Sequence, residues 1–313
     1  MESTQQSASA VFMVRPGRFT FNPEAALDNV FQQQSTLDAT ILHHTVLKEF
    51  DNVVDTLISC GITVHVYQDL DEPHKPDAIF PNNWISLHSN GEVLLYPMCH
   101  PNRRLERRPD IIDDLRTRYV ITNVTDFSEK EQTGTYLEGT GSIIFDHINR
   151  RAYGSLSKRT DLQLLEHVAS YLGYRTISFR SYDEQGLPIY HTNVMMCIGT
   201  NFAVVCLECI QDPEERRTVK KSLEKTGHTM VDITVKQVRN FAGNMLTLRP
   251  RGTVAIEREL LVMSQNAFDS LTSEQMEVLH KYCKIVTVSI PIIEKIGGGG
   301  VRCMLAEIFL PTM

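Results

Sequence analysis

AIFPNNWISLHSNGEVLLYPM, residues 78–98, is the stretch from which the architecture of this 313-residue chain follows. Two apolar runs, Ala78–His88 and Val93–Met98, flank the turn Ser89-Asn90-Gly91. Asn and Gly supply the backbone geometry of a tight turn between antiparallel strands, so the stretch predicts a β-hairpin. An amphipathic helix is predicted over Arg104–Tyr119, and a β-branched strand over Val120–Val124. The unit is therefore strand, turn, strand, helix, strand.

The same order of elements recurs four more times, at intervals of roughly 50–60 residues, which suits a ββαβ module. The other predicted hairpins are Ser142–Phe145 with Ala152–Leu156, Asn193–Ile198 with Phe202–Cys209, Asn244–Arg249 with Val254–Arg258, and Cys303–Leu310 with Val11–Arg15. The helices predicted to follow them are Asp161–Leu172, Pro213–Thr226, Leu271–Tyr282 and Thr40–Cys60. The last strands of these modules are Thr176–Phe179, Met230–Thr234, Ile285–Ile290 and Thr63–Tyr67.

Five such modules in a ring predict an α/β fold, a five-bladed α/β propeller with pseudo-fivefold symmetry and no free sheet edges. Closure of the ring explains why the fifth hairpin combines the first and last predicted strands. A doubly wound parallel sheet is the alternative, but it would alternate single strands with helices, whereas these units begin with hairpins. We expect a single domain over residues 11–313, preceded by a flexible segment, residues 1–10.

Composition bounds the class of protein. The net charge is −7, which gives no basic footprint for a nucleic acid partner and no polybasic membrane anchor. No apolar run approaches the roughly 20 residues that a membrane span needs. Met1–Ala10 lacks the pattern of an export signal, and the seven cysteines are an odd number. We therefore expect a cytoplasmic protein with reduced thiols.

Two of the cysteines, Cys206 and Cys209, have the C-x-x-C spacing of redox and zinc sites. They lie in the apolar run Phe202–Ile210, and no second pair of ligands is nearby. The sequence therefore predicts that both pack in the core.

Four consecutive glycines, Gly297–Gly300, precede the run Val301–Ile308, which contains Cys303 and is predicted to form a strand. Glycine allows backbone conformations that other residues avoid and lets a ligand approach closely. A thiol placed by such a hinge at the end of a strand is positioned like a nucleophile. The alternative is a buried core cysteine, which is the commoner fate of a cysteine.

Polar or reactive residues precede the first hairpin strand of every module. They are Asp77 with Asn82-Asn83, Glu138, His191 with Asn193, Asn240 with Asn244, and Cys303. Equivalent positions converge on the axis of a ring, so one carboxylate, one imidazole and one thiol would meet there. Glu138 alone could be a turn residue and His191 a buried structural histidine, but together with Cys303 they have the makeup of a thiol hydrolase.

These motifs resemble the pentein superfamily of guanidino-group-modifying enzymes, which includes arginine deiminase, dimethylarginine dimethylaminohydrolase and the amidinotransferases. The resemblance spans essentially the whole chain. It is carried by Pro76-Asp77-Ala78-Ile79-Phe80-Pro81-Asn82-Asn83, Leu137-Glu138-Gly139, Ser157-Lys158-Arg159-Thr160-Asp161, His191-Thr192-Asn193 and Gly299-Gly300-Val301-Arg302-Cys303-Met304. The Phe-Pro-Asn-Asn-Trp motif is similar to that of the citrulline-utilisation hydrolase branch.

The resemblance implies a role for several residues. Cys303 would be the nucleophile, His191 the general acid and then base, and Glu138 the group that holds the imidazole. Asp77 would contact the amino-acid end of the substrate. Arg103 and Arg159 would bind its α-carboxylate, for which the guanidinium fork is suited. No metal and no cofactor is implied.

Two positions depart from the pattern of the arginine-hydrolysing relatives. Asn83 and Asn193 stand where those relatives have carboxylates, so two negative charges are missing from the place of a guanidinium. A buried cation needs charged partners, whereas an amide offers one donor and one acceptor, which match a neutral ureido group. The sequence therefore predicts hydrolysis of citrulline to ornithine, ammonia and carbon dioxide. The alternative is that Glu138 alone suffices for a guanidinium.

In the expected mechanism Cys303 reacts as a thiolate, favoured by an imidazolium at His191. Other outcomes stay open: an arginine or methylarginine hydrolase, an amidinotransferase, and a non-catalytic pentein that binds a partner. The expected partner is a small amino-acid substrate. Self-association into a homo-oligomer is left open.

Overall fold

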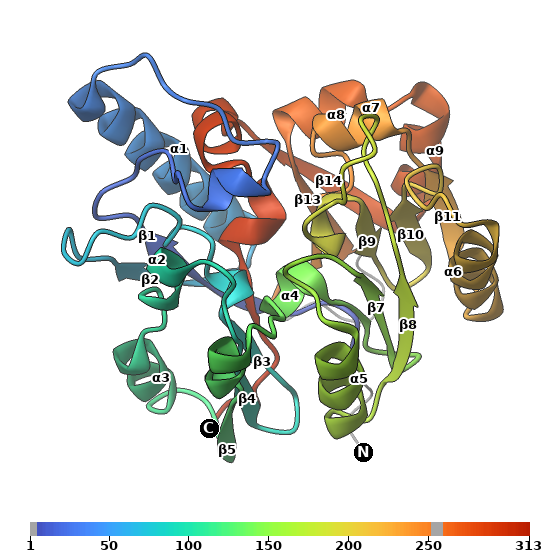
Figure 1. The fold of residues 1–313 in the computed structure, drawn as a ribbon, viewed down its shortest axis with the longest axis horizontal. Coiled ribbons are helices and arrows are strands. Elements are labelled where there is room, and N and C mark those ends of the chain that lie inside the picture. The colour runs from blue at the N-terminus through green and yellow to red at the C-terminus, as the bar shows by residue number, and fades with distance from the viewer. Residues whose placement is uncertain (1–4, 252–258) are drawn as a thin grey trace.

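Five three-stranded blades surround a common axis in the computed structural model, which describes residues 5–251 and 259–313 (Figure 1). The helices lie around the periphery, and the short helix α4 (Gly139–Ser142) lies near the middle. The fold is a five-bladed α/β propeller, as the repeated hairpins predict.

Each blade pairs its strands in the same way. An inner and a middle strand form an antiparallel hairpin, and an outer strand pairs in parallel with the middle one, as β6, β7 and β8 do. The strands are β1 (Ala10–Arg15), β2 (Thr63–Gln68), β3 (Ile85–Leu87), β4 (Glu92–Leu95), β5 (Asn123–Asp126), β6 (Ile144–Asp146), β7 (Arg151–Ser155), β8 (Arg175–Phe179), β9 (Met196–Ile198), β10 (Phe202–Val205), β11 (Thr229–Asp232), β12 (Leu246–Leu248), β13 (Glu259–Ser264), β14 (Cys283–Val288) and β15 (Ala306–Ile308).

The closing blade joins the first and last strands. Strand β1 pairs antiparallel with β15, with Phe12 opposite Ala306, and parallel with β2. Strand β15 also pairs with β3 through Ile308 and Leu87, so two blades share the six-stranded sheet β2-β1-β15-β3-β4-β5. This pairing confirms the predicted split of the fifth module.

The helices follow the hairpins and bury one face. In α5, Leu164, Leu165 and Val168 are buried, and Asp161 caps the helix by accepting a hydrogen bond from the backbone N–H of Leu164. The longer helices are α1 (Ala39–Ser59), α5 (Leu162–Tyr171), α6 (Pro213–Lys225) and α9 (Ser273–Tyr282). The shorter ones are α2 (Pro101–Arg104), α3 (Pro109–Leu115), α4, α7 (Val235–Arg239) and α8 (Gln265–Ser270).

One predicted helix is wrong. Arg104–Tyr119 is not continuous, because α2 ends at Arg104 and α3 begins only at Pro109. A proline disfavours helical backbone at the residue before it, and Arg108 accordingly has an extended conformation (φ −119°, ψ 94°). Strand β5 correspondingly begins at Asn123 rather than at Val120.

The predicted middle strand of the fourth blade cannot be compared with the structure over its whole length. The predicted strand Val254–Arg258 falls in a stretch, residues 252–258, outside the described residues. The middle strand that the structure describes is β13, which pairs with β12 through Leu261 and Thr247. The sequence reading also missed helix α8.

The described part of the N-terminal segment packs against the propeller, although we expected residues 1–10 to be flexible. The Gln6 side chain donates a hydrogen bond to the carbonyl of Phe145 (2.9 Å) and accepts one from the backbone N–H of His147 (2.9 Å). Ala8 bridges to Leu248. The amide of Gln6 satisfies buried backbone groups and thereby ties this polar segment to the propeller. The domain limits at residues 11–313 remain a prediction.

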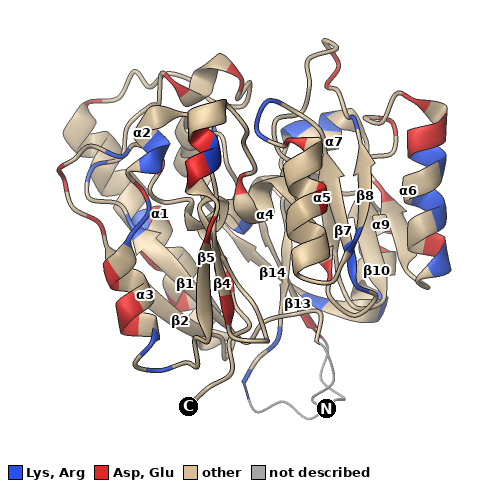
Figure 2. Ribbon diagram, turned by 60° about the horizontal axis from the view of Figure 1, so that its bottom comes forward, with Lys and Arg blue, Asp and Glu red and all other residues tan. Residues whose placement is uncertain are grey.

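The surface charge, the lengths of the helices and the position of two cysteines can be compared with the expectations from composition. Positive and negative residues alternate along α6 and are scattered over the other helices and loops (Figure 2). No helix within the described residues is long and apolar enough to cross a membrane. Cys206 and Cys209 are buried in the core with their sulfurs 2.8 Å apart, which confirms the core position.

Candidate active site

Most candidate site residues lie in short turns before the inner strands, whereas Arg103 lies in α2 and Arg159 in the loop after β7. Asn83 ends the 3₁₀ turn Pro81–Asn83, Asn193 lies in the turn Thr192–Val194, and Glu138 precedes α4. Cys303 lies in the turn Val301–Met304, so the prediction that it belongs to a strand is wrong. The inner strands run outward from the axis after these turns, and the side chains therefore meet at its centre.

The glycine run lets other chain segments pack directly on the backbone beside Cys303. Gly298 has a φ of +62°, and a Cβ atom there would lie 2.5 Å from Cγ of Gln32. Such a contact is closer than side chains allow, so this position requires glycine on both counts. The segment 22–32 thereby reaches the site.

Glu138 and His191 form a fully buried pair. The imidazole Nε2 lies 2.7 Å from Oε2 of Glu138, and Oε1 accepts the backbone N–H of Cys99 at 2.9 Å. Burial alone would raise the pKa of Glu138, but Arg159 and His191 outweigh it and hold the pKa well below its usual value. An ionised Glu138 fixes the proton of His191 on Nε2 and leaves Nδ1 as an acceptor.

Cys303 is buried and receives two hydrogen bonds. The side-chain amides of Asn193 and Asn244 each donate to its sulfur at 3.3 Å. The backbone N–H of Arg302 donates to Oδ1 of Asn244 (3.1 Å), which forces the Nδ2 of that amide toward the sulfur. Asn244 belongs to the polar cluster of the fourth module, and its repeat position was the signal that could have marked it as a site residue.

The pKa shifts of Cys303 and His191 both favour the neutral groups in the unliganded site, whereas the expected mechanism passes through a thiolate and an imidazolium. Burial raises the pKa of Cys303, and the two asparagine amides offset this only in part. Burial also lowers the pKa of His191 to about 4, although Glu138 opposes the shift. A charged pair is disfavoured because both groups are removed from water. The proton of the thiol must therefore move during the reaction.

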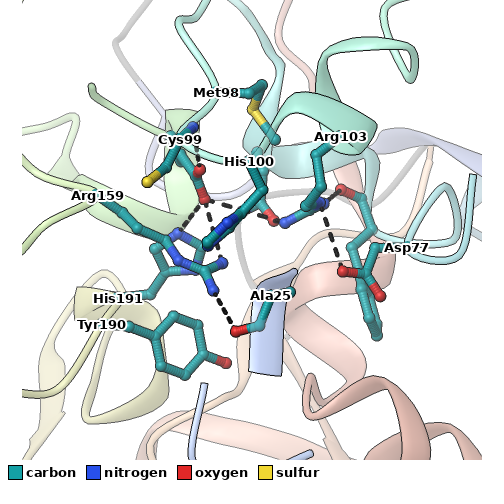
Figure 3. Close-up of polar contacts among 12 residues, drawn as sticks. Ala25, Asp77, Met98, Cys99, His100, Arg103, Arg159, Tyr190 and His191 are labelled. Carbon is teal, nitrogen blue, oxygen red and sulfur yellow. Dashed lines mark hydrogen bonds and ion pairs between the residues drawn. The ribbon is translucent and has the colours of Figure 1, made fainter. Parts of the chain in front are cut away.

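Arg103 lies beside Asn83 and is held by a carboxylate that the sequence reading missed. Its Nε and one terminal nitrogen bind the two oxygens of Glu106 at 2.8 and 2.9 Å, and its other terminal nitrogen donates to Oδ1 of Asn83 at 2.9 Å. Figure 3 shows Arg103 on the side of the site that faces Asp77, across from His191. Glu106 follows Arg103 by three residues in a run of charged residues, and nothing else in the sequence distinguishes it.

Arg159 occupies the other side of the site, against the ring of Tyr190 (Figure 3). Its Nε lies 3.1 Å from Oδ1 of Asp28, one terminal nitrogen also binds Asp28, and the other lies 3.5 Å from Glu138. The carboxylate of Asp28 thus occupies the guanidinium nitrogens of Arg159 that, by the resemblance, would bind a substrate carboxylate.

Asp77 connects the site to the segment 22–32. Its carboxylate accepts a hydrogen bond from Asn22 (2.7 Å) and lies 3.7 Å from Nε of Arg103. Gln32 donates to the carbonyl of Gly297 (2.9 Å). The cavity beneath this segment has a volume of about 10 Å³, room for about one water molecule. An amino-acid substrate therefore requires the segment to move.

The structure thus brings all eight predicted site residues into one region. The cavity is lined by Asn29, Asp77, Phe80, Asn83, Arg103, Arg159, Tyr190, His191, Gly297–Gly299 and Cys303. Glu138 lies behind His191, and Asn193 lies behind Cys303. Two guanidinium groups and one carboxylate, that of Asp77, line this cavity.

The family model described as N,N dimethylarginine dimethylhydrolase, eukaryotic, matches residues 15–310. The chain belongs to this family. As a dimethylarginine dimethylhydrolase homologue it is a member of the pentein superfamily and is homologous to hydrolases that act on guanidino groups. A comparison with curated proteins finds no match.

Solved structures show the fold of this dimethylarginine dimethylhydrolase homologue. ArgZ, an arginine dihydrolase from cyanobacteria, superimposes with a TM-score of 0.73 at 16% identity, over 97% of this chain and 41% of ArgZ. The chain thus spans about two fifths of ArgZ. The N-terminal domain of ArgZ, covalently bound to a reaction intermediate, superimposes with a TM-score of 0.72 at 16% identity, over 96% of this chain and 98% of that domain. A DDAH variant from Pseudomonas aeruginosa, complexed with citrulline, superimposes with a TM-score of 0.63 at 15% identity, over 96% of this chain and 100% of the DDAH chain.

A cluster of possible metal ligands lies beside the candidate site of this dimethylarginine dimethylhydrolase homologue, and a second cavity lies apart from it. Within residues 5–251 and 259–313, Asp28, Cys99 and His100 have ligand atoms within 4.8 Å of one another, as a metal site would need. Arg159 also binds Asp28, and this cation opposes a metal there. A larger cavity of about 710 Å³ is lined by Arg150 and Arg249 and contains none of the predicted site residues.

Gly141 tests how tightly the site of this homologue is packed. A Cβ atom at Gly141 would lie 2.4 Å from Nδ2 of Asn83 and 2.8 Å from Nδ1 of His191. We expect Gly141→Ala to lower kcat/KM about 100-fold, since small displacements of reacting groups have effects of that size. Steady-state kinetics measures the loss. Gly227→Ala is the control, because Gly227 has a φ of +81° with nothing within 4 Å; it should cost stability and leave kcat/KM unchanged.

The pH dependence should reflect the neutral resting pair. The reaction requires a protonated Cys303 thiol and a neutral His191 that can accept its proton. Both conditions hold above about pH 4, because the pKa of His191 is about 4 and that of Cys303 is raised. We expect kcat/KM to stay flat across neutral pH and to fall on the acid side only as the pKa of His191 is approached. Kinetics paired with circular dichroism at each pH separates this loss from acid unfolding. An acid limb near the ordinary histidine pKa would contradict the buried neutral imidazole.

Proposed function

We propose that this protein hydrolyses the ureido group of citrulline, releasing ornithine, ammonia and carbon dioxide. The observation that supports it best is a pair of buried polar atoms without partners among the described residues: Nδ2 of Asn83, a donor, and Oδ1 of Asn193, an acceptor. A ureido group presents a carbonyl acceptor and N–H donors, and so complements one of each. A guanidinium presents only donors.

The charges around the cavity support a neutral group. Arg103 and Arg159 line it with a single carboxylate, Asp77, which already lies 3.7 Å from Nε of Arg103. Adding a guanidinium to two buried guanidinium groups would place like charges together in a region with little water. Arginine is therefore the poorer substrate in this proposal.

The reaction would begin with attack of the Cys303 sulfur on the ureido carbon, as its proton moves to Nδ1 of His191. His191 then donates that proton to the nitrogen of the departing ornithine as the C–N bond breaks. The product on the enzyme is a carbamoyl thioester at Cys303. Asn193 and Asn244 stabilise the negative charge on sulfur through the hydrogen bonds that they already donate.

Water completes the cycle. His191 takes a proton from water, the hydroxide adds to the carbamoyl carbon, and the C–S bond breaks to regenerate the thiol. Carbamate leaves and decomposes to ammonia and carbon dioxide. Glu138 keeps the imidazole oriented in both halves of the reaction and stabilises its protonated form.

The amino-acid end of the substrate would exchange with groups of the protein. Arg159 already presents its Nε and one terminal nitrogen to a carboxylate, that of Asp28. The α-carboxylate of citrulline would replace Asp28 when the segment 22–32 moves aside. Asp77, freed from Asn22, would bind the α-ammonium group.

The test is incubation of the purified protein with citrulline, arginine, and mono- and dimethylarginine in separate reactions, with ornithine, citrulline and ammonia as readouts. We expect ornithine from citrulline, with one ammonia per ornithine. Conversion of arginine to citrulline without loss of citrulline would contradict the proposal, as would a lack of turnover of all four compounds. Ornithine from both citrulline and arginine would instead assign an arginine dihydrolase activity, the activity of ArgZ.

A further inference from the structure

We propose that the larger cavity, of about 710 Å³, binds a small oxyanion with two or more negative charges, such as a phosphate ester or a polycarboxylate. Two arginines of its wall, Arg150 and Arg249, would bind the anionic groups. The cavity is separate from the one that contains Cys303, and the inference does not depend on the proposed ureido reaction. Its volume is typical of cavities that hold small ligands in proteins.

The cavity lies at the end of the inner strands that is opposite to the candidate active site. The active-site turns precede these strands, whereas the cavity is lined by residues that follow them: His88 after β3, Arg150 after β6, Arg249 after β12 and Leu310 after β15. Ser9, directly before β1, adds to the wall. Hairpin turns from several modules therefore surround one cavity at this end of the ring, as the active-site turns do at the other end.

Positive charge dominates the wall of this cavity, although the net charge of the chain is −7. Arg150 and Arg249 line it, and no aspartate or glutamate is among the lining residues that the structure describes. Neither arginine forms an ion pair with a described carboxylate, whereas the active-site residues Arg103 and Arg159 are both paired with one. Two guanidinium groups without a counter-charge in one cavity favour an anionic ligand.

Arg249 has a hydrogen-bond donor that lacks a partner. Its Nε is buried and makes no hydrogen bond to any described residue. Its backbone N–H donates to the carbonyl of Ala8 at 2.9 Å, so the residue is fixed in place although the side chain is not. A buried donor without an acceptor is costly. An oxygen of a bound anion would supply the acceptor, since a guanidinium binds a carboxylate or phosphate group through two parallel hydrogen bonds.

Arg150 is held by neutral groups, which leave its charge without a counter-ion. One terminal nitrogen donates to the carbonyl of Leu172, and the guanidinium carbon lies 4.0 Å from the centre of the Tyr174 ring. The hydroxyl of Tyr174 lies 2.7 Å from Nδ1 of His147, which fixes the ring in turn. Arg150 is exposed, so an anion can reach it from solvent. Because the guanidinium is already positioned, binding would cost less side-chain entropy than a free arginine would require.

The histidines of the cavity contribute no positive charge at neutral pH. Burial, and after it the charge of Arg150, lowers the pKa of His88 to about 3. Burial, His88 and Arg150 likewise lower the pKa of His147 to about 3. The nearby carboxylate of Glu307 is paired with Arg302 at 2.8 Å and lies outside the lining. The charge of the cavity is therefore set by its two arginines.

A bound anion would connect elements that are distant in the sequence. Arg150 belongs to the turn between β6 and β7, Arg249 follows β12, and Leu310 follows β15, the strand that closes the ring against β1. A ligand that binds only the folded chain stabilises it by mass action. We therefore expect the anion to raise the unfolding temperature.

The test is titration of the full chain with pyrophosphate, ATP and citrate by calorimetry, with acetate as the monovalent reference. At least one of the first three should bind with a Kd below about 1 mM and raise the unfolding temperature, whereas acetate should do neither. Tighter binding of pyrophosphate or ATP would identify the ligand as a phosphate compound, and tighter binding of citrate as a polycarboxylate. Sodium chloride at about 0.5 M should weaken binding by screening. Absence of saturable binding of all three would overturn the inference.

Substitutions then place the anion in the cavity. Arg150→Gln and Arg249→Gln should each weaken binding about 10-fold or more, and the double variant should abolish it. Arg249→Lys, which keeps the charge but not the fork, should weaken it less than Arg249→Gln. Arg151→Gln is the matched control, because Arg151 is the next residue, donates to Oγ of Ser222 at 2.7 Å and does not line the cavity.

The unfolding temperature without anion shows whether each variant folds. It should change little, because neither arginine has a described carboxylate partner that the substitution would leave unpaired. Undiminished binding in the folded double variant would overturn the inference, as would an equal loss of affinity in Arg151→Gln. The titrations require no turnover, so the outcome is independent of whether the protein hydrolyses citrulline.

Discussion

Cys303→Ser should reduce turnover of citrulline by roughly 10⁴-fold or more, because serine is not ionised by a neighbouring neutral imidazole as readily as a thiol. The fold should be unaffected, since the hydroxyl is smaller than the thiol and can accept the hydrogen bonds of Asn193 and Asn244. Kinetics and intact-protein mass spectrometry after rapid acid quench measure the effect. The parent should carry one carbamoyl group during turnover, and the variant none.

The control for thiol loss is Cys60→Ser. Cys60 is partly exposed at the end of α1 and lies outside the candidate site, so its variant should retain full turnover and form the carbamoyl adduct. Peptide mapping should place the adduct on Cys303. Retention of more than about 1% of the parental kcat by Cys303→Ser would rule out the nucleophilic role.

Glu138→Gln should lower kcat by about 10³–10⁴-fold with little change in KM, the size of effect seen where a carboxylate orients a catalytic imidazole. The glutamine amide can still accept from Nε2 of His191, but it no longer stabilises the imidazolium that forms during attack. It can also turn its NH₂ toward Nε2 and thereby fix the wrong tautomer. Steady-state kinetics reports the split between kcat and KM.

Stability must be measured alongside, because Arg103 and Arg159 both lie within 4.0 Å of the Glu138 carboxylate. Removing one member of a buried charged network costs about 3–5 kcal/mol, so a lower unfolding temperature is expected. Glu92→Gln is the control, since Glu92 is buried among Asn123, Thr125 and Tyr171, which line no part of the site. Retention of a tenth or more of kcat in a folded Glu138→Gln variant would show that the carboxylate does not orient His191.

The repeat made most of the fold predictable. Each hairpin turn has its own Gly, Asn or Pro signal, and the helices after it have one apolar face, so the module and its fivefold repetition could be predicted. The ends of elements that depend on a local interruption of the chain pattern could not be predicted. Pro109 stops a continuous helix at a place where amphipathic spacing persists.

The sequence made it possible to predict which residues form the site, but not which partners they contact. Cys303, His191 and Glu138 could be selected because they occupy equivalent places in the repeat. Asp28 and Glu106 could not, since both are carboxylates in polar stretches, and only the fold brings them to Arg159 and Arg103. The raised pKa of Cys303 could not be predicted either, because burial by distant segments cannot be inferred from its neighbours in sequence.

The pairing of β1 with β15 has a consequence for how the protein acquires activity. Joining strands so distant along the polypeptide costs much loop-closure entropy, which makes this step of folding slow. Cys303 lies just ahead of β15, whereas Glu138 and His191 belong to blades built from local contacts. A ribosome-bound intermediate could therefore assemble the acid–base half of the centre before it holds a nucleophile, and maturation of the enzyme would coincide with completion of the ring.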